Sequence, residues 1–178
     1  MVVRTIILSK SDESARALYD FTMRRGGVTL CARPMDTSVE MWSRCFPREC
    51  FAEPITETTK FIFIVKDFAD KLSGDALEAV VAHEHGHDVL KHPDGWAEAG
   101  LPVDFEKEYE ADAYAAKITS PAALIEGLER SKAFVMEVML PYMVPDDELP
   151  PDEILQLMHE SLDVAFGSRI ERLRAMMN

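Results

Sequence analysis

Two histidines four residues apart, His83 and His87, flank a glutamate in the run His-Glu-His-Gly-His. On an α-helix this spacing puts both imidazoles on one face, where they can bind a single cation. A bound zinc ion lowers the pKa of its water to near 7, and an adjacent carboxylate can take the proton as that water attacks a carbonyl. The run predicts a zinc site with Glu84 as general base. The competing interpretation is a histidine-rich, solvent-exposed helix.

A catalytic zinc also needs a third protein ligand and an open coordination position. The segment after the motif offers six acidic candidates: Glu98, Asp104, Glu106, Glu108, Glu110 and Asp112. Helical spacing does not choose among them, because Glu106 with Glu110 and Glu108 with Asp112 are both i,i+4 pairs.

The segment from Leu72 to His92, followed by Glu108-Tyr-Glu-Ala-Asp-Ala-Tyr-Ala-Ala, resembles the gluzincin metallopeptidases of the CAAX prenyl protease and HtpX type. It is also similar to their single-domain relatives, the minigluzincins. The resemblance implies an α+β zincin-like fold, a zinc cofactor and hydrolysis of a peptide or protein substrate. It further implies that Glu108 is the third zinc ligand and that Asp112 supports a zinc histidine.

Two departures from the family limit what the resemblance implies. The membrane helices of the prenyl protease and HtpX members are absent, so membrane-protein substrates do not carry over. Ala165-Phe-Gly-Ser stands where the family has His-Pro, just before Arg169-Ile.

Helical periodicity agrees with the assignment of Glu108. The helical face that carries this glutamate also carries Ala111, Asp112 and Ala115, and small alanines allow two helices to approach closely. Glu106, Glu110 and Tyr109 would then lie on a solvated face.

Several other residues could take part in binding or catalysis, and some of them are explained as well by surface or structural roles. His85 points away from His83 on a helix and should not bind the same ion, while His92 and His159 are predicted to have surface or structural roles. An oxyanion could be stabilised by His159, Tyr114, Tyr142 or Arg169. The Cys31 thiolate could block a zinc ion's open position, although most free cysteines are small buried hydrophobes.

Several segments should position these residues. We expect strands at Val2–Leu8, Val28–Arg33 and Thr59–Val65, with a helix at Asp12–Arg25 that stops at Gly26-Gly27. The strand at Thr59–Val65 is either a core strand or an edge strand that pairs with extended peptide.

Helices are expected after residue 75. The motif helix should span Ala76 to Lys91 and begin at a capping box of Asp75 and Glu78. Further helices are predicted at Phe105–Thr119, at Pro121–Met139 with Ser120 as N-cap, at Pro151–Phe166 and at Arg169–Met177. Pro141 to Pro151 should form a loop.

Composition narrows the class of protein. The 178 residues fit a single domain, with an N-terminal part at 1–70, metal-site helices at 71–135 and C-terminal helices at 150–178. A net charge of −13 disfavours nucleic acid as a partner, and we expect Arg169, Arg172 and Arg174 to form a solvated helix face. No apolar stretch is long enough for a membrane span.

Three cysteines, Cys31, Cys45 and Cys50, fit reduced thiols in the cytoplasm. The sequence therefore favours a zinc metallopeptidase. The alternative is a non-catalytic or latent zincin-fold module that binds a protein partner.

Overall fold

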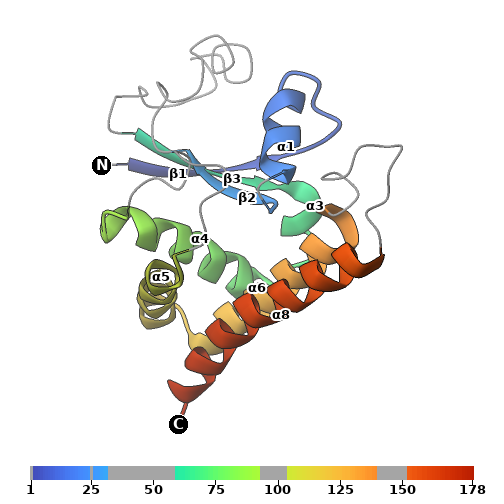
Figure 1. Cartoon of the computed structure of the whole chain (residues 1–178). Helices are drawn as coiled ribbons and strands as arrows, with labels where there is room; N and C mark the ends of the chain where they lie inside the picture. The colour runs from blue at the N-terminus through green and yellow to red at the C-terminus, as the bar shows by residue number, and fades with distance from the viewer. Residues whose placement is uncertain (1, 25, 32–58, 93–103, 140–151) are drawn as a thin grey trace. The chain divides into compact units, whose positions relative to one another are not determined.

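The computed structural model describes residues 2–24, 26–31, 59–92, 104–139 and 152–178, and the chain is α+β, with a small three-stranded sheet and mostly helical content (Figure 1). It forms two compact units, Met1–Asp70 and Lys71–Asn178. Whether they make one zincin-like domain, as expected, stays a prediction. Several predicted features lie outside the described residues: Ala32 and Arg33, Cys45 and Cys50, Glu98, Tyr142, the loop at 141–151 and the side chain of Cys31.

The first unit is built on strand β3 (Thr59–Val65), which lies in the middle of the sheet order β1-β3-β2. Strand β1 (Val2–Leu8) pairs with it in parallel, Val2 opposite Thr59, and β2 (Val28–Cys31) pairs antiparallel, Val28 opposite Ile64. Phe61 to Val65 are fully buried. β3 is therefore a core strand, and the idea that it is an edge strand open to substrate is wrong.

Helix α1 (Arg16–Met23) lies over this sheet and is shorter than predicted. Asp12 does not start the helix, because its carboxylate accepts the backbone N–H of Ser14 at 3.0 Å in a local turn. Ala15, Leu18, Tyr19 and Thr22 are buried on one side of this segment. Gly26 and Gly27 have φ of 100° and 81°, which explains glycine at the turn into β2. Helix α3 (Lys66–Ala69) follows β3.

The second unit begins with the motif helix α4 (Gly74–Val89). Its N-cap is Ser73, not Asp75, because the Ser73 hydroxyl accepts the backbone N–H of Ala76 at 3.2 Å. The carboxylate that completes the cap comes from another helix: Glu126 accepts the Ser73 backbone N–H at 3.2 Å and its hydroxyl at 2.8 Å. The capping box of Asp75 and Glu78 is therefore wrong.

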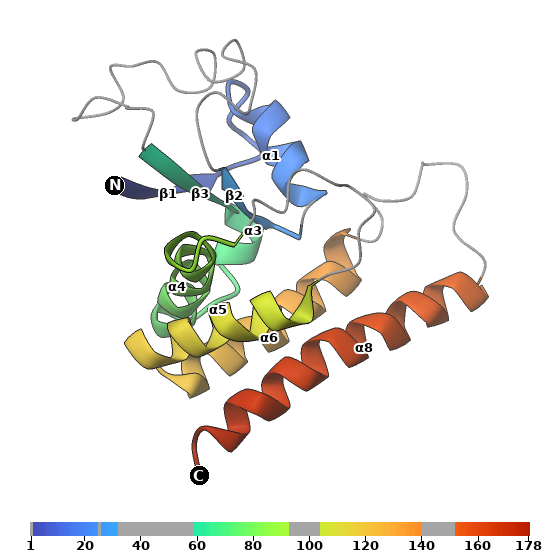
Figure 2. The same ribbon diagram turned by 60° about the vertical axis from the view of Figure 1, so that its left-hand side comes forward.

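The described part of this unit holds three further helices. They are α5 (Phe105–Ile118), α6 (Pro121–Phe134), which continues as the π-helical turn η2 (Val135–Met139), and α8 (Asp152–Ala175). Ser120 caps α6 as predicted, accepting the N–H of Ala123 at 3.1 Å. The two predicted C-terminal helices are one continuous helix, because Gly167 stays helical. α6 and α8 run side by side in opposite directions (Figures 1 and 2).

Two glycines set how closely helices pack on α4. A Cβ atom on Gly86 would lie 3.3 Å from the Ala111 Cα of α5, and one on Gly127 of α6 would lie 2.8 Å from a methyl of Val80. Both helices therefore pack tightly against α4, with the buried alanines Ala79, Ala111 and Ala115 near the helix contacts. Among the described helices, none is both long and apolar enough to cross a membrane.

Candidate metal centre

His83 and His87 of α4 and Glu108 of α5 bring their ligand atoms together, all within 4.8 Å of one another. The two histidine Nε2 atoms are 3.1 Å apart. His83 Nε2 lies 3.3 Å from Glu108 Oε2, and His87 Nε2 lies 3.4 Å from Glu108 Oε1. Two imidazole nitrogens and a carboxylate that converge in this way can hold a metal ion.

Asp112, one helical turn after Glu108, supports His83 from behind. Its Oδ1 lies 2.9 Å from His83 Nδ1, so the imidazole can donate there while Nε2 faces Glu108 and His87. The carboxylate is buried, with 3% of the residue exposed. This contact fixes the ring orientation of His83 and, when the ring is neutral, its tautomer.

Arg169 of α8 neutralises the carboxylates of Asp112 and Glu108. Its Nε and Nη2 donate to the two oxygens of Asp112, each at 2.7 Å, and its Nη1 lies 3.0 Å from Glu108 Oε2. The side chain is 12% exposed. We expect Arg169 on a solvated face with Arg172 and Arg174; for Arg169 that expectation is wrong, because the buried Asp112 and the half-buried Glu108 require a cation. Arg172 and Arg174 are exposed.

A tyrosine fixes how α8 docks on α5. Tyr109 donates its hydroxyl to Ser168 Oγ at 3.0 Å, and the Arg172 guanidinium lies 3.7 Å from the Tyr109 ring centre. The solvated position predicted for Tyr109 is wrong, since it is half-buried between these residues. The contact lies next to Arg169 in α8 and so helps to position its guanidinium.

The two histidines have opposite protonation preferences. Burial opposes charge on His83, but hydrogen bonds to Asp112 and Glu108 outweigh burial and raise its pKa to about 9. Burial, together with the positive charge of His83, lowers the pKa of His87 to about 4. Without a metal ion, His83 is therefore charged at neutral pH and His87 is neutral.

Both carboxylates remain ionised throughout the neutral range. Burial opposes their charge, but contact with His83 and Arg169 lowers the pKa of Glu108 to about 2 and that of Asp112 to about 2. Two negative groups thus face two positive ones, Arg169 and protonated His83. A metal ion bound by these ligands would therefore have to displace a proton from His83.

Glu84 lies beside this group on α4 and is half-buried. Burial raises its pKa above the ordinary value, as does the negative charge of Glu108, while His83 and Arg169 act in the other direction. A carboxylate with a raised pKa can exchange a proton more readily near neutral pH.

The other predicted candidates lie away from the ligand atoms. His85 packs edge-on against Tyr114, with ring centres 6.0 Å apart. Asp104, Glu106 and Glu110 are exposed, and so is His159. Arg169 alone of the described oxyanion candidates contacts the cluster.

His92 was assigned no role in the site, yet it lies within it. Its Nδ1 is 2.9 Å from His87 Nδ1, and its Nε2 is 2.9 Å from Glu110 Oε2. His92 follows His87 by five residues, and α4 ends between the two. Helical spacing therefore does not predict their contact.

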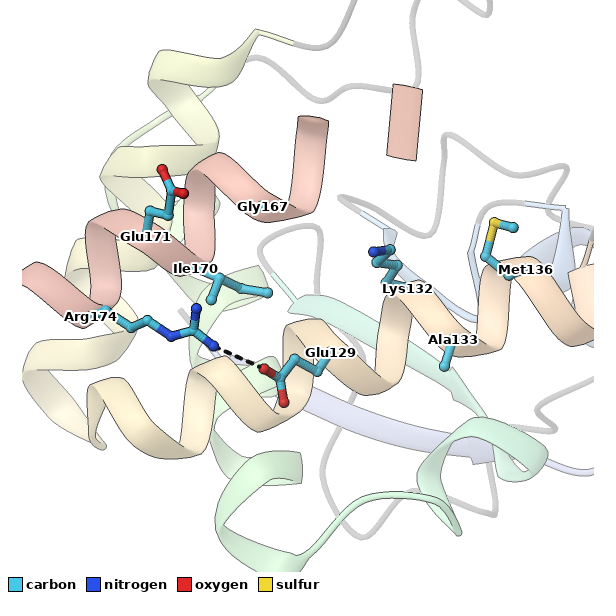
Figure 3. A pocket seen from close by; sticks show the side chains of 8 residues that line it. All are labelled: Glu129, Lys132, Ala133, Met136, Gly167, Ile170, Glu171 and Arg174. Atoms are coloured by element: carbon cyan, nitrogen blue, oxygen red, sulfur yellow. Dashed lines mark hydrogen bonds and ion pairs between the residues drawn. The ribbon is translucent and has the colours of Figure 1, made fainter. Parts of the chain in front are cut away.

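A separate cleft of about 410 Å³ lies between α6 and α8 (Figure 3). Lys132 and Met136 line it from α6 and η2, and Gly167 and Ile170 from α8, with Glu129 and Arg174 paired at 3.4 Å. None of the converging ligands lines this cleft, so it adds nothing to the chemistry of the metal centre.

The cluster fits a divalent metal ion by its donor set. Two neutral imidazoles and one carboxylate are what a catalytic zinc ion binds, and both His83 and Glu108 have partners that hold their ligand atoms in place. No known protein family, curated protein or solved structure matches the chain.

Proposed function

We propose that this chain is a zinc-dependent metallopeptidase of the gluzincin type, with a zincin-like fold. The observation that carries the proposal is the convergence of His83, His87 and Glu108, with Glu84 next to the first histidine in the helix. Zinc suits this set because it takes nitrogen and carboxylate ligands and leaves a fourth position open in catalytic sites. A bound zinc ion would supply a Lewis acid at that position.

Residues around the ligands would transfer protons and hold the ligands in place. Glu84 would take a proton from the attacking water and pass it to the leaving amine, a role that its raised pKa favours. Asp112 would hold the His83 ring, and Arg169 would hold Asp112 and Glu108 in their ionised forms. The described residues bring three ligands together, whereas structural zinc sites usually have four protein ligands, often cysteines, and this favours a catalytic site here.

The test compares wild type with Glu84→Gln on a library of unfolded peptides, after both proteins are loaded with zinc. Glu84→Gln should bind zinc as wild type does and lose cleavage by about 100-fold or more. Glu78→Gln is the matched control, because Glu78 is an exposed glutamate of the same helix. Equal cleavage by wild type and Glu84→Gln would remove the mechanism, and no cleavage by wild type would favour the non-catalytic, partner-binding module.

A further inference from the structure

Helix α4 ends in a turn that folds the chain back onto His87. Lys91 is left-handed, with φ of 58°. Its N–H donates to Asp88 O at 3.1 Å, and the N–H of His92 donates to His87 O at 2.9 Å. These two bonds form the Schellman motif, which fixes the residue after the turn relative to the last helical turn. His92 is therefore held beside His87 by its backbone.

The side chains of His92 and His87 are also in contact. Nδ1 of His92 lies 2.9 Å from Nδ1 of His87, with the rings nearly edge-on at 71°. On its other side, Nε2 of His92 lies 2.9 Å from Oε2 of Glu110. The His92 side chain is 6% exposed, whereas that of Glu110 is 62% exposed. A continuous chain of hydrogen bonds thus runs from the surface of α5 to the second histidine of the cluster.

One arrangement of protons satisfies the hydrogen bonds from His87 through His92 to Glu110 when His87 binds a metal ion. Nε2 of His87 faces Glu108 and His83, so its lone pair must be free for the ion and its proton must be on Nδ1. That N–H then donates to Nδ1 of His92. His92 must therefore carry its own proton on Nε2, where it donates to Glu110.

We propose that His92 and Glu110 are positioning residues for His87, holding its ring and its Nδ1–H tautomer. The inference rests on the proposed metal site and deepens it. The two ligand histidines then have different supports: His83 has a buried carboxylate paired with Arg169, and His87 has an imidazole backed by an exposed carboxylate. Loss of His92 should therefore matter more than loss of Glu110.

The test measures zinc affinity by competition with a chromophoric chelator, which needs no enzymatic activity. His92→Phe keeps a ring but no acceptor and should weaken zinc binding about 10- to 100-fold. His92→Asn restores an acceptor near Nδ1 and should recover most of the lost affinity. Glu110→Gln should lose less than about tenfold, and Glu106→Gln, an exposed acid of the same helix, should bind as wild type does.

A second readout is the scalar coupling between the two Nδ1 nuclei across the hydrogen bond, measured in zinc-loaded protein labelled with ¹⁵N-histidine. The coupling should be present in wild type, and its absence would overturn the inference even if His92→Phe failed to fold. Equal zinc binding by wild type and His92→Phe would also overturn it. So would equally weak binding by His92→Phe and His92→Asn, because restoring the acceptor would then restore no affinity. If wild type bound no zinc, the proposed metal site itself would fail.

Discussion

Gly86 of α4 and Ala111 of α5 lie so close that a Cβ atom on Gly86 would stand 3.3 Å from both the Cα and the carbonyl oxygen of Ala111. It would also meet Cδ1 of Tyr114 at 3.0 Å. Gly86 is the residue before His87, and Ala111 precedes Asp112. This close contact between the two helices therefore lies next to residues of the metal centre.

Replacing Gly86 with alanine should push the two helices apart. Overpacking of this kind costs about 1–3 kcal/mol of unfolding free energy, and the separation should also weaken zinc binding. Denaturant unfolding and zinc competition measure the two effects. Gly167→Ala is the matched control, since its Cβ would meet nothing within 4 Å. There the better helix propensity of alanine should stabilise the protein by up to about 1 kcal/mol. Stabilisation by both substitutions would contradict the role given to Gly86.

Asp112→Asn should damage stability and metal binding together. Arg169 and His83 would lose a buried negative partner, and breaking a buried ion pair costs about 3 kcal/mol. Zinc affinity should fall about tenfold or more, because His83 loses its support. Asp163→Asn removes an exposed carboxylate that pairs with Lys132 on the surface and should cost less than about 1 kcal/mol. Thermal unfolding and zinc competition would show whether the two substitutions differ in this way.

Zinc binding should depend on pH through His83. Because its pKa is about 9 without metal, His83 must lose a proton to bind zinc at pH 7, whereas His87, with a pKa of about 4, is already neutral. We expect release of about one proton per zinc ion at pH 7, and affinity that rises about tenfold per pH unit up to about pH 9. Calorimetry in buffers of different ionisation enthalpy measures the protons released. Affinity that does not change with pH would contradict the charged state of His83.

The stability of the metal-free protein should fall as pH rises, whereas its affinity for zinc should increase. The folded-state pKa of His83 lies above its ordinary value of 6.5, so its contribution to stability is complete below pH 6.5 and is lost as pH rises toward 9. The melting temperature of metal-free protein should therefore fall across this range. The rise in melting temperature on adding zinc should become larger over the same range. A metal-free melting temperature that rises from pH 6.5 to 9 would contradict this account.

Local sequence signals predicted the elements of the site well. The β-branched run at Thr59–Val65, the Ser120-Pro121 start of α6 and the alanine face around Asp112 each depend on neighbours in the chain, and the structure has all three. The convergence of His83 with His87 follows from helical spacing, but the choice of Glu108 needed a resemblance to a known family.

Contacts between distant segments could not be predicted from the sequence. Arg169 lies 57 residues after Asp112, so no local pattern distinguishes it from Arg172 or Arg174. The carboxylate that completes the α4 cap likewise comes from Glu126, 53 residues after Ser73. His92 was missed because a left-handed residue at Lys91, where glycine is more usual, turns the chain back onto His87.

The central claim is that His83, His87 and Glu108 together hold a zinc ion. The most direct measurement is the zinc content of wild type, Glu108→Ala and Glu106→Ala after zinc loading and exhaustive dialysis. Glu106 is the control because it is 77% exposed and lies two residues before Glu108 in the same helix. We predict about one zinc ion per chain in wild type and Glu106→Ala, and far less in Glu108→Ala. Equal zinc in all three proteins, or none in wild type, would contradict the claim.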